Sequence, residues 1–94
     1  MIAFGDLWAG LDYAAYESHV CVIDSNGAIR FQGSSDSSPE QTVSLLSPFR
    51  EKLQLIGLEA GVGTHLARGL IGASFPVAAF EARQASKFLR IHRK

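Results

Sequence analysis

The feature that most constrains the fold is the run LQLIGLE at Leu53–Glu59, which is almost continuously apolar and closes on an acid. Runs of this kind are typical of strands buried on both faces, and such strands occur in parallel sheets that helices cover. The run therefore predicts an α/β fold, in which helices pack against a sheet.

The first third of the chain predicts an antiparallel meander of three strands. Leu7–Asp12 alternates small and large residues and ends at an acid, and Glu17–Asp24 is rich in apolar and β-branched residues. The Asn-Gly pair at positions 26 and 27 is a strong hairpin signal, because both residue types tolerate positive φ. A third strand is expected at Ala28–Gly33, followed by a polar linker over residues 34–37.

A helix is predicted directly after this linker. Ser38 should be its N-cap, Pro39 its first residue and Gln41 its capping-box residue. Pro48 should end the helix near Ser47, because proline lacks the N–H that a helix needs.

The second half continues with helix, strand and helix. Thr64 is expected to cap a helix after the turn Gly61–Gly63, and Gly69 and Gly72 should each weaken that helix by about 1 kcal/mol relative to alanine. A fifth strand is expected at Pro76–Phe80, and a third helix from Arg83 onward.

This order of elements places two acids side by side. A right-handed crossover puts Leu53–Glu59 parallel to Leu7–Asp12, on its free side. Asp12 and Glu59 then end neighbouring strands at the edge where α/β sheets bind ligands, about 5 Å apart. Two carboxylates at that separation repel each other unless a cation lies between them, and Mg²⁺ or Mn²⁺ suits such oxygen ligands. Either acid alone is more often a turn or cap residue, but the pair favours a metal site for phosphodiester chemistry.

Composition sets the remaining limits. With 94 residues, 47% hydrophobic and 19% charged, the chain should be one globular domain, 1–94, and not a disordered segment. Its apolar runs are too short to span a membrane, and its N-terminus is unlike a secretory signal. The single cysteine, Cys21, is expected to be buried, so the predicted location is cytoplasmic.

The net charge of zero conceals a basic C-terminus. The last helix should carry a basic face, which either is a solvated surface or contacts nucleic-acid phosphates. The candidate nucleic-acid-binding residues on that face are Arg83, Lys87, Arg90 and Lys94.

Several segments together resemble a known family. Gly10-Leu11-Asp12, HVCVIDSNGAI, IGLEAGVGTHLARGL and PVAAFEARQASKFLR are similar, in order and spacing, to the N-terminal domain of DEDD-type insertion-sequence transposases. This RuvC-like family includes the pilin-gene invertase Piv and the bridge-RNA-guided recombinases. The segment Ala82-Arg83-Gln84-Ala85 matches the family's Pro-Arg-Gln-Ala type of segment, which leads into a basic helix.

The resemblance carries expectations about fold, activity and partners. It implies a ribonuclease H-like fold, with a mixed five-stranded sheet flanked by about three helices. It also implies magnesium-dependent cleavage and strand transfer of DNA in transposition and recombination, with a guide RNA in some members. In the family the residues that match Asp12 and Glu59 are catalytic metal ligands.

The chain also departs from the family's pattern. The family's Asp-x-x-Asp pair is expected beyond the basic helix, and the chain ends at Lys94. Tyr13-Ala14-Ala15 replaces a small residue and a lysine, and Gly61-Val62-Gly63-Thr64 replaces Thr-Gly and an aromatic residue. We therefore expect the N-terminal part of a longer transposase, with weak Mg²⁺ or Mn²⁺ binding and little or no activity by itself.

Two alternatives remain open, and with them whether the chain is an enzyme. It could be a non-catalytic module, either a folded remnant or one that associates with itself or with the full-length transposase. Phe88, Leu89 and Ile91 could drive formation of a homodimer. The chain could also be the N-terminal half of an actin-like ATPase or sugar kinase, although residues 13–16 supply no Gly-Thr/Ser phosphate loop. His19 and His65 show no metal-ligand spacing and are expected to be ordinary surface or partly buried residues; the sequence offers no support for a general-base role of either.

Overall fold

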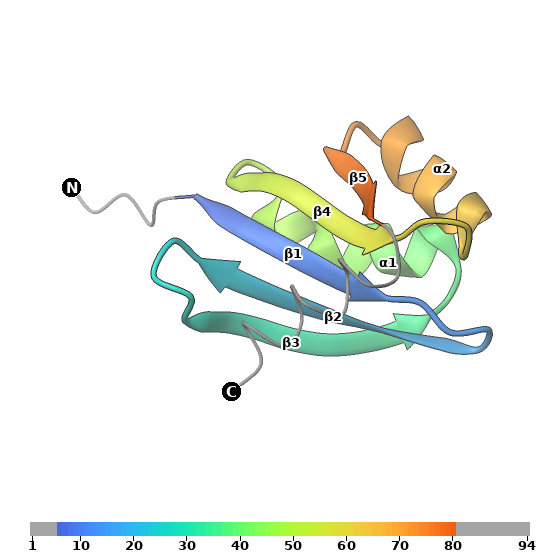
Figure 1. Ribbon diagram of the computed structural model, residues 1–94, viewed down its shortest axis with the longest axis horizontal. Coiled ribbons are helices and arrows are strands. Elements are labelled where there is room, and N and C mark those ends of the chain that lie inside the picture. The colour runs from blue at the N-terminus through green and yellow to red at the C-terminus, as the bar shows by residue number, and fades with distance from the viewer. Residues whose placement is uncertain (1–5, 81–94) are drawn as a thin grey trace.

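The computed structural model describes residues 6–80 and shows one mixed sheet with helices packed on one face (Figure 1). The strand order is β3-β2-β1-β4-β5. Strands β1 to β3 are antiparallel neighbours, whereas β4 is parallel to β1 and β5 is parallel to β4. The elements are β1 Leu7–Asp12, β2 Glu17–Asp24, β3 Ile29–Asp36, α1 Pro39–Leu46, the 3₁₀ turn η1 Ser47–Phe49, β4 Leu53–Glu59, α2 Thr64–Gly72 and β5 Val77–Phe80.

This architecture confirms the predicted α/β class and the predicted sheet. Strands β1, β2 and β4 have the predicted bounds, and β5 begins one residue later than expected. The predicted third helix and its predicted basic face, with Arg83, Lys87, Arg90 and Lys94, fall on residues that lie outside the described part of the chain. Neither helix in residues 6–80 is long and apolar enough to cross a bilayer.

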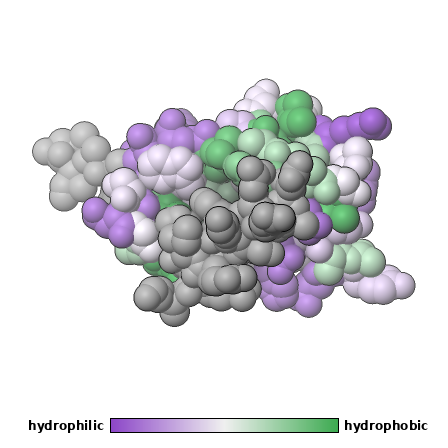
Figure 2. Space-filling view, viewed as in Figure 1, coloured by the Kyte–Doolittle hydropathy of each residue, from purple (hydrophilic) through white to green (hydrophobic). Residues whose placement is uncertain are grey.

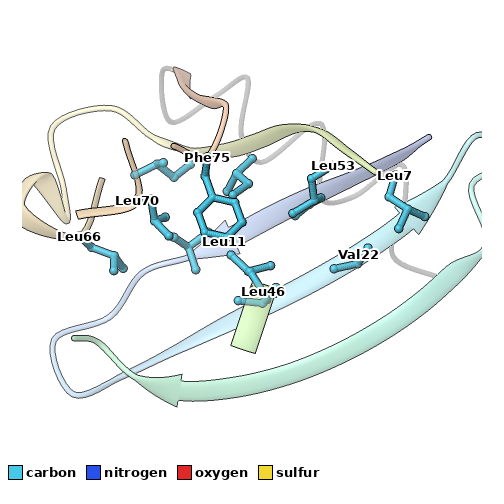
Figure 3. Packing of buried hydrophobic residues seen from close by; sticks show 12 residues of the cluster. Leu7, Leu11, Val22, Leu46, Leu53, Leu66, Leu70 and Phe75 are labelled. Atoms are coloured by element: carbon cyan, nitrogen blue, oxygen red, sulfur yellow. The ribbon is translucent and has the colours of Figure 1, made fainter. Parts of the chain in front are cut away.

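The core lies between the sheet and the two helices. Alternate residues of the central strands point toward α1 and α2, as the period of two in a strand requires. In Figure 3 Leu46 of α1 and Leu66 and Leu70 of α2 meet the side chains of the sheet, and Phe75 fills the space among them. The buried cluster comprises Leu7, Ala9, Leu11, Val20, Val22, Leu46, Leu53, Ile56, Leu58, Leu66, Leu70 and Phe75.

Strand β3 is longer than predicted, and the linker expected over residues 34–37 is wrong. The strand continues to Asp36, because β2 offers an unbroken row of backbone partners down to the pair Glu17–Asp36. The serines at positions 34 and 35 suggested a loop by composition, but pairing with a neighbouring strand outweighs their weak intrinsic preference.

The β2–β3 hairpin forms at the predicted place with a different turn. Gly27 has φ +81°, whereas Asn26 does not take a positive φ. The Asp24 carbonyl accepts from Gly27 N–H at 2.9 Å, and one Asp24 carboxylate oxygen accepts from the N–H groups of Asn26 and Ala28. The turn therefore needs one left-handed residue, and Asp24 holds it in place.

The sequence predicted the start of α1 correctly but the cap of α2 incorrectly. Ser38 caps α1 as expected, since its hydroxyl accepts from Gln41 N–H at 3.2 Å, and Pro48 follows the end of α1 in the short turn η1. The predicted cap Thr64 is wrong, because Gly63 occupies the N-cap position of α2 and no side chain caps that end. Cys21 is half-buried on β2, contrary to the expectation of a buried residue.

Candidate functional site

Asp12 and Glu59 lie at the same edge of the sheet, as the order of elements predicted. Strands β1 and β4 pair in parallel with Leu11 opposite Leu58, so Asp12 and Glu59 are the next residues of the two neighbouring strands. Both strands run toward the right in Figure 1, and both end at these acids. Leu11 and Leu58 point into the core, and therefore the two carboxylates point to the other face of the sheet, which we call the second face.

The two carboxylates are exposed and are not structural caps. Within residues 6–80 neither one makes a hydrogen bond or an ion pair. By contrast, Asp36 accepts from the hydroxyl and the backbone N–H of Ser38, which lowers its pKa, and Glu17 accepts from the Ser34 hydroxyl at 2.9 Å. The turn-or-cap interpretation of Asp12 and Glu59 therefore fails in the part of the chain that the structure describes.

The strand registers extend this pair into a row across the whole sheet. Asp12 is paired with His19 of β2, and His19 is paired with Ser34 of β3. On the other side, Glu59 is paired with Phe80 of β5. Directly paired residues project from the same face of a sheet. Ser34, His19, Asp12, Glu59 and Phe80 therefore form one transverse row on the second face, which we call the carboxylate row.

Behind the carboxylate row, the side chains on the second face first become smaller and then, one row further, become large and apolar. The next row contains Gly10 and Gly57 on the two central strands. The ring of Phe80 lies over Gly57, where an added β-carbon would come within 2.8 Å of it. One row further on, Trp8 is paired with Ile23 and with Leu55. From Trp8 to Asp12 on β1 and from Leu55 to Glu59 on β4, the polar side chains of this face are therefore confined to the carboxylate row.

A depression of about 270 Å³ lies at the β2–β3 side of Asp12. It is lined by Asp12, His19, Val20, Cys21, Gln32, Gly33 and Ser34. A larger depression of about 510 Å³ lies at the opposite end of the sheet, around Leu7 and η1, far along the strands from the carboxylates. Figure 2 shows hydrophilic and hydrophobic residues interspersed over the part of the molecule visible in that view.

The charges on the strands are segregated. Asp12, Glu17, Asp36 and Glu59 all lie toward the carboxylate end. In the five described strands the single Lys or Arg is Arg30, near the start of β3 at the other end, where it pairs with Asp24 at 3.3 Å. Within the described strands this acidic edge holds no Lys or Arg, and an edge of that charge favours a cation and repels a bare phosphate.

The donor set at the edge is incomplete as a metal site. Among residues 6–80 there is no group of three His, Cys, Asp or Glu side chains that could hold a metal ion. Asp12 and Glu59 would therefore supply two oxygen ligands, and the remaining positions would need water or other groups. Two carboxylates with free lone pairs still match what Mg²⁺ and Mn²⁺ prefer, because these ions keep several waters.

The glycine turn after Glu59 does not offer a phosphate loop. Gly61 and Gly63 have φ of +87° and +61°, and the Tyr13 ring occupies the space beside Gly63. This packing makes the segment a tight turn, and it supports neither a phosphate cradle nor the actin-like alternative.

Sequence reasoning missed the contribution of β2 and β3 to this site. His19 and Ser34 were not candidates, because His19 was expected to be an ordinary surface or partly buried residue and Ser34 to lie in a polar linker. Gln32 was not singled out. In the structure Asp12 is paired with His19, and in the connection between β1 and β2 the Ala14 N–H donates to the Ser18 hydroxyl at 3.2 Å. No single motif signals this pairing, which the register of β1, β2 and β3 decides.

Comparison with known proteins establishes the fold. No protein-family model and no curated protein matches the chain. It is similar to the crystal structure of the large terminase nuclease from thermophilic phage G20c, with a TM-score of 0.66 and 17% identity. The match covers 93% of this chain and 50% of the other, so the chain spans half the length of that protein. The fold is ribonuclease H-like, as predicted.

Proposed function

We propose that the chain is part of a metal-dependent nucleic-acid-cleaving domain, with Asp12 and Glu59 as its metal-binding carboxylates. The observation that carries the proposal is the placement of two exposed acids, without side-chain partners among residues 6–80, on adjacent parallel strands. Ligands of open α/β sheets bind outside the carboxyl ends of such strands. The similar terminase structure is named as a nuclease, which supports the same class of chemistry.

The residues present fit a hard divalent cation. Asp12 and Glu59 would hold Mg²⁺ or Mn²⁺ through carboxylate oxygens, and the acidic edge around them would favour its binding. A bound cation of this kind stabilises the charge that develops on phosphodiester oxygens during cleavage. With two carboxylates the binding is expected to be weak, and turnover by residues 1–94 alone is expected to be low.

The finer assignment rests on the sequence resemblance. It makes the chain the N-terminal part of a DEDD-type insertion-sequence transposase, a cytoplasmic recombinase acting on DNA, with a guide RNA in some relatives. The basic residues Arg83, Lys87, Arg90 and Lys94 would contact DNA phosphates. Self-association through Phe88, Leu89 and Ile91 remains the non-catalytic alternative; all of these residues lie outside the described part of the chain.

Manganese binding tests the proposed site directly. Mn²⁺ is titrated into the 94-residue chain, and the free ion is followed by its electron paramagnetic resonance signal. Asp12→Asn and Glu59→Gln should each weaken Mn²⁺ binding by roughly tenfold or more, because each removes a charged oxygen ligand.

The chain offers a matched control at the other end of the same strands. Asp6 directly precedes β1, and Glu51 lies just before β4. Asp6→Asn and Glu51→Gln change the net charge by the same amount as the site variants, so they should leave Mn²⁺ binding unchanged. Equal losses in all four variants would show a nonspecific charge effect and would contradict the proposed site.

A further inference from the structure

We propose that the depression beside Asp12 is a subsite for a phosphate of a nucleic-acid strand, adjacent to the phosphate at the two carboxylates. His19 and Gln32 would donate hydrogen bonds to its oxygens. This inference rests on the proposed function, since it concerns the same substrate.

The position of the depression makes it an extension of the carboxylate row. His19 and Ser34 continue that row from Asp12 across β2 and β3, and Gln32 lies one row behind them, opposite Cys21. One strand spacing, about 4.8 Å, separates Asp12 from His19. A strand held at Asp12 and Glu59 can therefore present its next phosphate over β2 and β3.

The side chains lining the depression are suited to an anion. Both His19 and Gln32 are exposed, and neither side chain has a hydrogen-bond partner within residues 6–80. An imidazole donates through at least one N–H in any protonation state, and the glutamine amide donates through two. Ser34 is oriented differently, because its hydroxyl already donates to Glu17 at 2.9 Å. It borders the subsite without contributing a free donor.

Because acidic side chains lie beside the subsite, phosphate binding there should depend on a bound cation. Asp12 and Glu17 lie beside the subsite and repel a phosphate, so strand binding should strengthen when Mn²⁺ neutralises Asp12 and Glu59. Two sites coupled in this way affect each other reciprocally, so the strand should also tighten Mn²⁺ binding.

The test measures binding and does not depend on cleavage. A dye-labelled single-stranded oligothymidylate is titrated with the 94-residue chain at fixed salt, with and without Mn²⁺, and fluorescence anisotropy is recorded. His19→Leu and Gln32→Ala should each weaken binding in the presence of Mn²⁺ by about tenfold or more, as expected for one hydrogen bond to a charged group. His19→Gln keeps an N–H donor and should retain most of the affinity, and Gln54→Ala on β4 serves as the glutamine control.

Mn²⁺ affinity, measured on the same variants, separates the two proposals. Unchanged oligonucleotide binding in His19→Leu and Gln32→Ala would overturn the subsite, while the metal site would stand. Loss of Mn²⁺ binding in His19→Leu would make His19 a metal ligand and would also overturn the subsite. Normal Mn²⁺ binding in Asp12→Asn and Glu59→Gln would instead overturn the proposed function.

Discussion

The ring of Tyr13 packs against Gly63 so closely that a β-carbon at Gly63 would come within 2.8 Å of Tyr13 Cδ1. Tyr13 directly follows Asp12, and Gly63 lies in the turn that follows Glu59. The same ring meets His65 edge to face, with centroids 6.1 Å apart. The chain segments that leave the two carboxylates therefore pack on each other, and this contact holds the two strand ends together.

Gly63→Ala should destabilise the protein and weaken its metal binding. A left-handed φ of +61° costs an L-residue about 1–2 kcal/mol, and the β-carbon must also displace the Tyr13 ring. The free energy of unfolding is measured by urea denaturation, and Mn²⁺ affinity is measured on the folded variant.

Gly61→Ala is the matched control for this contact. Gly61 has φ +87°, but an added β-carbon there meets nothing within 4 Å. Gly61→Ala should therefore lower the free energy of unfolding only by the cost of the positive φ, and it should keep normal Mn²⁺ affinity. If both variants lose the same stability and the same affinity, the Tyr13 contact does not position the site.

Two glycines of α2 should respond to alanine with opposite signs. At Gly69 a β-carbon would collide with Pro39 at the start of α1, whereas at Gly72 it would meet nothing within 4 Å. Gly69→Ala should therefore destabilise by about 1–3 kcal/mol through overpacking. Gly72→Ala should stabilise by up to about 1 kcal/mol through helix propensity. Thermal and urea unfolding of both variants measure the difference, and a stabilised Gly69→Ala would contradict the close contact of the two helices.

Ser18→Ala should be costly although the residue is small. Ser18 is fully buried, and its hydroxyl lies 2.6 Å from that of Ser37 and accepts from Ala14 N–H. Removal leaves the Ala14 N–H without its acceptor, at a cost of about 1–3 kcal/mol. The exposed turn residue Ser25 provides the control, and Ser25→Ala should change the unfolding free energy little. If Ser18→Ala and Ser25→Ala both changed the unfolding free energy little, the hydroxyl pair of Ser18 and Ser37 would make no net contribution to stability.

Stability should fall in acid through two carboxylates. The hydrogen bond from the Ala28 N–H lowers the pKa of Asp24, and that from the Ser38 hydroxyl lowers the pKa of Asp36. A lowered folded-state pKa adds stability that is complete above the unfolded pKa, about 3.9, and disappears as pH falls through the folded pKa.

Asp24→Asn and Asp36→Asn should therefore be less stable than the native chain near neutral pH, with the difference disappearing in strong acid. Urea unfolding across this pH range measures the effect. Carboxyl NMR titration of the native chain gives the two pKa values, and ordinary values for Asp24 and Asp36 would contradict the hydrogen bonds that we describe.

Local patterns predicted most of the elements, for identifiable reasons. The run at Leu53–Glu59 and the Ser38-Pro39 pair carry their signals within a few residues, so β4 and the start of α1 were predicted correctly. The predictions failed where a distant partner decides the outcome. Ser34 and Ser35 are in a strand because β2 lies beside them, and Gly63 displaces Thr64 as the cap of α2, where the chain turns against Tyr13.

The sequence by itself determined the α/β class and the neighbouring positions of Asp12 and Glu59. Hydrophobic period, turn residues and the handedness of crossovers act over short stretches of chain, and together they leave few possible sheets. Only the tertiary structure decided that Asp12 faces His19, that Tyr13 fills the space at Gly63, and that both carboxylates lack partners in residues 6–80. Register and side-chain packing depend on contacts between residues far apart in the chain, and no local pattern encodes them.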